Sequence, residues 1–262
     1  MSDKTLLDIT QEILNSMTGD EVNSIFDTAE AEAVARIVVS VFEGLVSNRN
    51  WAQHKSLFQL ESLSDNTKPT HCVLPDNCKE LLFIRHNNMK TGSTRKYFEK
   101  VKWKDPDEFL HYCEGRNTDN SNITEVTDIG GTPILIRTDK HPKFYTSFDD
   151  KHIVMDSLDT EFSDTIRPSN TQAHGYIMPV ATLEDGWKPD LPMEGIKLLV
   201  EEAKSVARFQ IDTTTDIKAE QEAGRQGRWL SRKQWSVNGG LKYPDYGRKR
   251  NKTTEATFRN EN

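Results

Sequence analysis

A run of acidic residues with one histidine is the part of this sequence that could most directly do chemistry. Carboxylates and an imidazole spaced this closely can hold a divalent metal ion, as in metal-dependent nucleases. Asp also favours tight turns, because its side chain accepts hydrogen bonds from backbone N–H groups just ahead of it. The first part of this run, Asp149-Asp150-Lys151, lies where a hairpin must turn between the apolar segments 144–148 and 152–155, so turn formation is favoured over a metal site. Its members are Asp149, Asp150, His152, Asp156 and Asp159.

Cysteine and glycine motifs give weaker candidates. The candidate zinc ligands are His71 with Cys72, Cys78, and His111 with Cys113. Cys72 and Cys78 have five residues between them, whereas paired zinc ligands usually have about two to four, and no second pair exists. An odd number of cysteines in a reducing compartment indicates free, buried thiols. Gly130-Gly131-Thr132 lacks the Lys of a phosphate loop and is typical of a hairpin turn. We therefore expect no catalytic residue, no metal and no cofactor, in a protein that is not an enzyme.

The 262-residue chain is polar, and its charge is unevenly distributed. Hydrophobic residues make up 35% and charged residues 29%, with a mean hydropathy of -0.71. Such a composition is expected where long surface helices, exposed loops or an extended tail take up many residues, or where folding is shared with neighbours in an assembly. Residues 218–262 carry 11 Lys and Arg against 5 Asp and Glu, whereas the first 217 residues carry 23 against 36. The chain has neither an apolar run long enough for a membrane nor a signal-peptide pattern, so we expect it to be made in a cytoplasm.

Apolar residues at helical spacing predict two helices near the N-terminus. The first is expected over residues 5–17, ended by Gly19 in a left-handed cap. The second is expected over residues 29–49, with Asp27 or Thr28 as its N-cap.

Two more helices are predicted near the C-terminus, at about 193–209 and 216–235. The last helix has a small apolar face, and such a helix must pack closely on its predecessor or on another subunit. The face consists of Ala219, Ala223, Gly227 and Leu230.

Short apolar runs between residues 51 and 189 predict strands rather than helices. One helix is expected there, near 106–114, because Asp105 can cap it and Pro106 suits its first position. The expected strands are 57–60, 71–75, 81–84, 123–126, 132–137, 144–148, 152–155 and 171–178. Hairpins are expected at Gly130-Gly131 and at Asp149-Asp150-Lys151.

These elements predict an α+β fold in three parts. Residues 1–50 and 190–238 are expected to form an antiparallel helical bundle, and residues 51–189 a β-rich insertion between its helices. Residues 239–262 are expected to form an extended C-terminal arm.

The basic C-terminal arm supports two interpretations. It can bind nucleic acid through its positive charge, or it can dock into an acidic crevice of a protein, with aromatic side chains as anchors. The candidate residues are Tyr243, Tyr246, Arg248, Lys249, Arg250, Lys252, Phe258 and Arg259.

The order of these features resembles the podovirus head-to-tail adaptors, also called tail tubular protein A. The resemblance spans roughly residues 29–235, and the arm matches by position only. The segments that carry it are AEAVARIV (31–38) running to Trp51, CVLPDN (72–77), FYTSFDD (144–150), PDLP (189–192), LLVEEAKS (198–205) and AEQEAGRQ (219–226).

This resemblance implies a structural protein of the virion neck, assembled in the host cytoplasm. Members form a ring, usually of twelve copies, beneath the portal, and meet the tail tube or nozzle protein with the opposite face. The arm would dock on the portal, and DNA would pass through the lumen without sequence-specific binding or any membrane. A stripe of basic and aromatic residues on the last helix would contact the adjacent subunit or the portal: Arg225, Arg228, Trp229 and Arg232. The alternative is a DNA-binding accessory protein that uses the arm.

Overall fold

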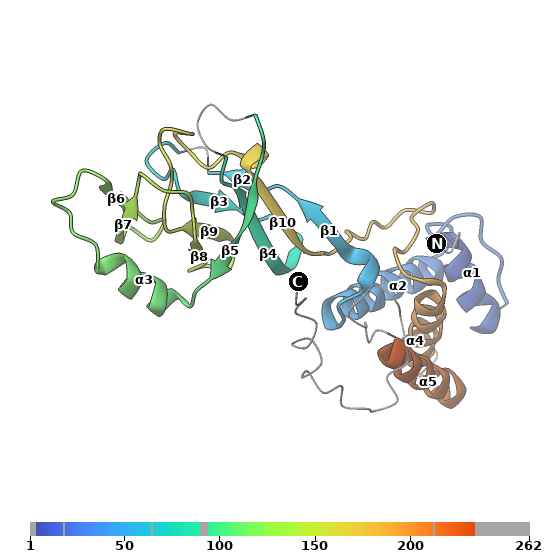
Figure 1. Ribbon diagram of the computed structural model, residues 1–262. Coiled ribbons are helices and arrows are strands. Elements are labelled where there is room, and N and C mark those ends of the chain that lie inside the picture. Colours follow the sequence, from blue (N-terminus) through green and yellow to red (C-terminus); the bar gives the residue numbers. More distant parts are fainter. Residues whose placement is uncertain (1–3, 18, 64, 90–93, 212, 234–262) are drawn as a thin grey trace, which may run out of the picture. The chain divides into compact units, whose positions relative to one another are not determined.

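A curled eight-stranded sheet is the largest element of this α+β chain (Figure 1). The computed structural model describes residues 4–17, 19–63, 65–89, 94–211 and 213–233. The order of the strands in the sheet is β1-β10-β4-β5-β8-β9-β3-β2, and β6 and β7 form a separate two-stranded sheet. The expected fold, a helical bundle that carries a β-rich insertion, is therefore wrong, because strands dominate the architecture.

The chain divides into two compact units, which we call the strand unit (Val46–Val180) and the helical unit (Met1–Leu45 with Ala181–Asn262). The strands are β1 (Lys55–Phe58), β2 (Glu61–Ser62), β3 (His71–Val73), β4 (Cys78–Asn87), β5 (Phe98–Trp103), β6 (Ile123–Thr127), β7 (Pro133–Arg137), β8 (Phe144–Thr146), β9 (His152–Met155) and β10 (Thr171–Ile177). The helices are α1 (Leu6–Met17), α2 (Ala29–Asn48), α3 (Pro106–Glu114), α4 (Met193–Ile211) and α5 (Ile217–Lys233), with short 3-10 turns at Ala52–His54 and Pro168–Asn170.

Long-range pairing joins the eight strands other than β6 and β7 into one sheet. β10 lies between β1 and β4, and β5 pairs with β4 on one side and runs parallel to β8 on the other. β5 was not predicted, because only Val101 of its six residues is buried and the strand therefore lacks a clear apolar pattern. Gly175 of β10 is required where the chains approach closely, since an added Cβ would lie 2.4 Å from the carbonyl oxygen of Glu80.

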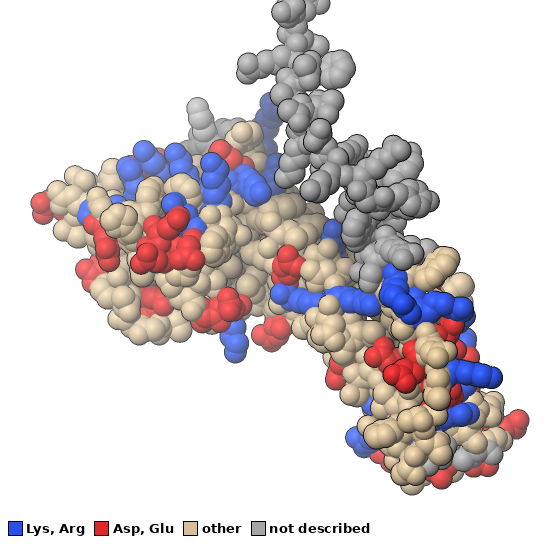
Figure 2. Space-filling model, turned by 90° about the horizontal axis from the view of Figure 1, so that it is seen from below, with Lys and Arg blue, Asp and Glu red and all other residues tan. Residues whose placement is uncertain are grey.

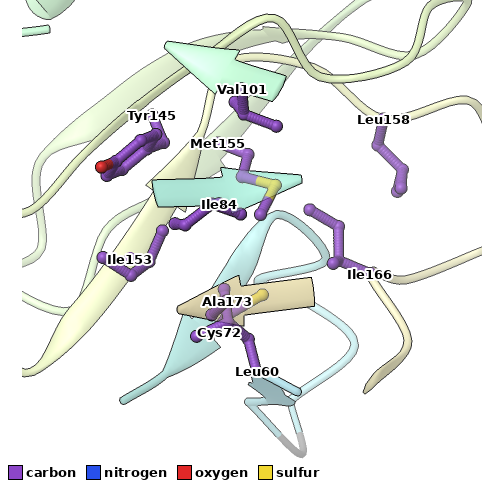
Figure 3. Packing of buried hydrophobic residues seen from close by; sticks show 10 residues of the cluster. All are labelled: Leu60, Cys72, Ile84, Val101, Tyr145, Ile153, Met155, Leu158, Ile166 and Ala173. Atoms are coloured by element: carbon purple, nitrogen blue, oxygen red, sulfur yellow. The ribbon is translucent and has the colours of Figure 1, made fainter. Parts of the chain in front are cut away.

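The curl of the sheet encloses its main core (Figure 3). Ile84, Val101 and Ala173 from β4, β5 and β10 share one buried cluster with Tyr145 and Ile153 from β8 and β9. Because residues of both ends of the sheet meet in this cluster, the sheet buries its own apolar face without help from a helix.

The opposite face of β9 is covered by α3 and the β6–β7 hairpin. Val154 packs in a second cluster with Phe109 and Cys113 of α3 and with residues of the hairpin. The Asp105 side chain caps α3 by accepting a hydrogen bond from Asp107 N, and Pro106 occupies the first turn, as predicted.

Both predicted hairpins are confirmed. β6 pairs antiparallel with β7 around Gly131. The φ of Gly131 is 84°, in the left-handed region that glycine adopts most readily. β8 pairs antiparallel with β9 around Asp150, whose φ is 59°. Asp149 accepts hydrogen bonds from the backbone N–H groups of Lys151 and His152, so it shapes the turn as the sequence indicated.

A buried ion pair between Arg116 and Asp156 ties the strand unit together. Their side chains are only 8% and 3% exposed, and Nη2 of Arg116 lies 3.2 Å from Oδ2 of Asp156. Arg116 Nη1 also donates to the carbonyl oxygens of Leu135 and Asp156, while Oδ1 of Asp156 accepts from the N–H groups of Lys143 and Phe144. One pair of charges thus links the loop after α3 with β7, β8 and β9.

The helical unit is closed by local caps and by an apolar core. Thr5 and Asp8 cap α1 reciprocally, because Thr5 N donates to the Asp8 carboxylate and Asp8 N donates to the Thr5 hydroxyl. Gly19, with a φ of 81°, ends α1, and the Thr28 hydroxyl caps α2, both as predicted. Phe42 of α2 packs edge-to-face on Trp187, with the ring centroids 4.9 Å apart.

We expect Asp156→Ala to lower the free energy of unfolding by about 3–5 kcal/mol, because it leaves a buried guanidinium without its counter-charge. The matched control is Asp139→Ala, which breaks an Arg137–Asp139 pair whose side chains are 35% and 31% exposed. That change should cost less than about 1 kcal/mol. Urea titrations followed by circular dichroism measure both, and equal losses would contradict this role for Asp156.

The three cysteines are free, as predicted, and they should differ in reactivity. Burial raises the pKa of Cys72 to about 12 and that of Cys113 to about 11, so neither forms the thiolate needed to react. Cys78 is only half-buried. In the folded protein at pH 8, a chromogenic disulfide reagent should therefore label Cys78 first, and Cys78→Ser should remove that fast phase. Simultaneous labelling of all three thiols without denaturant would refute this.

Candidate interaction surface

Helix α5 packs on α4 along a seam of three small residues and one leucine. Ala219, Ala223, Gly227 and Leu230 are all buried, and α5 packs against α4, as the four-residue spacing predicted. Small side chains let two helix backbones approach closely, but they bury little apolar area. The seam therefore sets the position of α5 without supplying much of the energy that holds it.

Polar contacts supplement the seam at the start of α5. Asp216 caps the helix by accepting from Ala219 N at 3.1 Å, and it forms an ion pair with Arg208 of α4 at 3.1 Å. Arg208 also donates to the carbonyl oxygen of Ser16 at the end of α1. The hydrogen bond from Ala219, with help from Arg208, lowers the pKa of Asp216. The cap therefore stabilises the fold fully above the unfolded pKa and loses this effect as the pH falls through the folded pKa.

A second set of polar contacts lies one turn further along α5. Glu222 accepts a hydrogen bond from Gln226 and forms ion pairs with Arg225 at 2.5 Å and with Lys197 of α4 at 3.2 Å. The hydrogen bonds from Gln226 and Arg225 lower the pKa of Glu222 to about 2. Glu222 therefore stays ionised near neutral pH and links the two helices by charge.

The side of α5 opposite the seam is basic and carries an exposed tryptophan. At 100° per residue, Lys218, Arg225 and Arg228 lie opposite the seam, and all three are exposed. Trp229 flanks them and is 61% exposed. Two of these side chains make polar contacts within α5 itself. Arg225 pairs with Glu222, and Arg228 Nε donates to the carbonyl oxygen of Gly224. We call Lys218, Arg225, Arg228 and Trp229 the outer face of α5. Figure 2 shows Lys and Arg gathered along one side of the helical unit.

The remaining predicted site residues lie outside what the structure describes. The side chain of Arg232 falls outside the described part, although its backbone continues α5. All eight predicted portal-binding residues of the arm, from Tyr243 to Arg259, also lie outside the described residues.

The residues that could have formed a metal site are used for structure. Asp149 shapes its turn and also accepts from His152 Nδ1 at 2.5 Å, while Asp156 is buried in the pair with Arg116. Asp159 lies 3.6 Å from His141 Nε2. Across the described ranges, no three His, Cys, Asp or Glu side chains gather as metal ligands.

Shallow hollows on the two units have mixed linings. One, of about 480 Å³, lies between α2 and α4 and is lined by Ile37, Val41 and Val206 among others. Another, of about 460 Å³ in the strand unit, includes Trp103, Tyr145 and Ser147. The second hollow is also lined by Lys79, Glu80 and Asp150, but both hollows are open to solvent, whereas a small-molecule site usually encloses most of its ligand. Over the described residues, no helix is long and apolar enough to cross a membrane.

The contacts of Arg208, Glu222 and Lys197 were not foreseen from the sequence. Arg208 of α4 pairs with Asp216 at the start of α5, and Lys197 of α4 pairs with Glu222 of α5. The sequence does not reveal such pairs, because charged residues at helical spacing are equally typical of a face exposed to solvent.

The described members of the basic stripe, Arg225, Arg228 and Trp229, are exposed, and helical periodicity places them away from the small residues. Their predicted contact with an adjacent subunit or the portal stays a prediction.

Substitution in the seam and just outside it should have opposite effects on stability. Ala223→Leu adds volume where α5 packs on α4 and should lower the free energy of unfolding by about 1–3 kcal/mol. Gly224→Ala should raise it by about 0.5–1 kcal/mol, because an added Cβ meets nothing within 4 Å and alanine favours the helix. Thermal unfolding measures both, and a neutral Ala223→Leu would mean that the seam is loosely packed.

No protein-family model matches the chain, and no curated protein is significantly similar to it. The outer face of α5 is therefore interpreted from its own geometry.

Proposed function

We propose that this chain is a structural head-to-tail adaptor of a short-tailed phage. It forms a ring beneath the portal, connects the capsid to the tail and lines the DNA ejection channel. The observation that carries the proposal is the outer face of α5, a helix that is fixed along one seam and presents Arg225, Arg228 and Trp229 to solvent. The order of sequence motifs that resembles these adaptors supports the same function.

The chemistry of the outer face suits a protein partner. Trp and Arg are the residues that most often dominate binding energy at protein interfaces. An exposed indole beside two guanidinium groups offers apolar area together with donors for carboxylates. A structural role in an assembly needs such a surface.

The sequence that follows α5 extends this basic character. Its eight candidate docking residues include three aromatic side chains, Tyr243, Tyr246 and Phe258, among five Lys or Arg. In this proposal they dock on the portal, where aromatic groups supply contact area and the positive charges meet carboxylates.

The acidic remainder of the chain fits a channel through which DNA slides. The first 217 residues carry 36 Asp and Glu against 23 Lys and Arg. A wall with excess negative charge repels phosphate, so DNA passes without binding to it. Channel-facing positions that proved to be mainly Lys and Arg would remove this part of the proposal.

A DNA-binding accessory protein is the second candidate. The exposed basic side chains of Lys218, Arg225 and Arg228, which share one face, favour it. Binding of this kind releases counterions, so affinity for duplex DNA would fall steeply as salt rises.

Removal of residues 241–262 should abolish binding to the cognate portal without unfolding the body of the protein. The mass of the purified chain, measured alone and with portal, tests this, because the full chain should form a ring on the portal. A matched control replaces residues 241–262 with a Gly/Ser segment of equal length and should also fail to bind. Unchanged portal affinity after deletion would exclude docking by the arm. A monomer that ignores portal but binds DNA would favour the second candidate.

A further inference from the structure

The N-terminal part of the helical unit is as acidic as the outer face of α5 is basic. Residues 5–35 contain seven acidic residues and no Lys or Arg. Four of them are exposed around the connection between α1 and α2, namely Asp20, Glu21, Asp27 and Glu30. The side chains of Asp20, Glu21 and Glu30 form no ion pair within the described part of the chain.

An exposed aromatic residue lies in the same connection, between Glu21 and Asp27 in the sequence. Phe26 is 57% exposed, whereas its neighbour Ile25 is fully buried. Ile25 N donates to Asp185 Oδ1 at 2.8 Å, and Asp27 Oδ2 accepts from Asn23 N and Ser24 N at 2.7 and 2.9 Å. These hydrogen bonds fix the loop, so the exposure of Phe26 is imposed by the fold. We call Asp20, Glu21, Phe26 and Glu30 the acidic face.

The acidic face and the outer face of α5 are complementary. Each presents one large aromatic side chain, Phe26 or Trp229, beside charges of a single sign. Aromatic anchors flanked by opposite charges match the composition of protein interfaces, in which charge sets the register and the aromatic groups supply apolar area.

We propose that the outer face of α5 in one copy docks on the acidic face of the next copy, so that chains associate head to tail. This inference rests on the proposed ring and names the partner of the α5 surface. A two-fold contact between two outer faces would bring like charges together, and the same holds for two acidic faces. Since α1 and α5 pack separately against α4, each copy offers both faces to neighbours. A contact between two different faces closes into a ring or continues as a filament.

Charge reversal on either face should stop assembly. Arg225→Glu with Arg228→Glu, or Asp20→Lys with Glu21→Lys, should leave a species of 30.0 kDa where the unchanged chain assembles, alone or on portal. Sedimentation at low ionic strength measures this, and circular dichroism checks that each variant folds. Lys100→Glu with Lys102→Glu, on exposed positions of β5, makes the same change in net charge as the first variant and should assemble normally.

Mixing the two charge-reversed variants gives the sharpest test. Arg225→Glu/Arg228→Glu keeps its acidic face, and Asp20→Lys/Glu21→Lys keeps its outer face, so these two faces can still form the original contact. The two reversed faces are also complementary to each other, so the mixture should assemble with the variants in alternation, although neither variant assembles alone. All four substitutions in one chain should restore assembly, because the reversed charges are again complementary.

The outcomes separate this inference from the proposed function. If the unchanged chain forms a ring on portal and both charge-reversed variants do so equally well, the head-to-tail contact is wrong and the adaptor proposal stands. If the unchanged chain stays monomeric with and without portal, both are wrong. Trp229→Ala and Phe26→Ala test the apolar part, since each should weaken assembly without changing net charge.

Discussion

The strand unit depends on one buried ion pair, that of Arg116 and Asp156. Taking two charges out of water is costly, and the fold offsets this cost by giving each group further hydrogen bonds to the backbone. These bonds fix where β7, β8, β9 and the loop after α3 meet, so the pair determines how the hairpins and α3 assemble. Asp156, one of the five residues of the acidic run that could have held a metal ion, is therefore enclosed, with both of its oxygens in use.

In the helical unit the ion pairs are partly exposed, and they hold helices together from the outside. Arg208 joins the ends of α1 and α4 to the start of α5, and Glu222 joins α5 to Lys197. With its seam and its first two turns fixed, α5 needs no contact on its remaining side. The outer face thereby stays open, with the basic and aromatic groups that an interface requires. Because ion pairs and the seam of small residues hold α5 on α4, its outer face is available to bind a partner.

Features set by a few adjacent residues could be predicted from the sequence. The caps at Thr28 and Asp105 and the turns at Gly131 and Asp149 follow from local backbone chemistry. The sheet could not be predicted in the same way, because β10 pairs with β1 and β4, which lie far away in the chain. β5 joins the two halves of the sheet by pairing with β4 and β8, yet only one of its residues is buried. The exposed stripe of α5 was predictable because periodicity defines it, whereas the acidic face depends on Ile25 turning inward and Phe26 outward.

A contact built from charges and two aromatic side chains has a consequence for when assembly occurs. Exposed charge pairs are individually weak and are screened by salt, so a single contact holds two free copies together poorly. In a closed ring every copy makes two such contacts, and a template that binds each arm raises the effective concentration of neighbouring copies. In this proposal the portal is the template, because each arm docks on it. The weak contacts between copies then add to the docking contacts, so the ring is stable on the portal and the copies stay apart elsewhere. An apolar interface of equal area would lack this control, because it would associate before the template is reached.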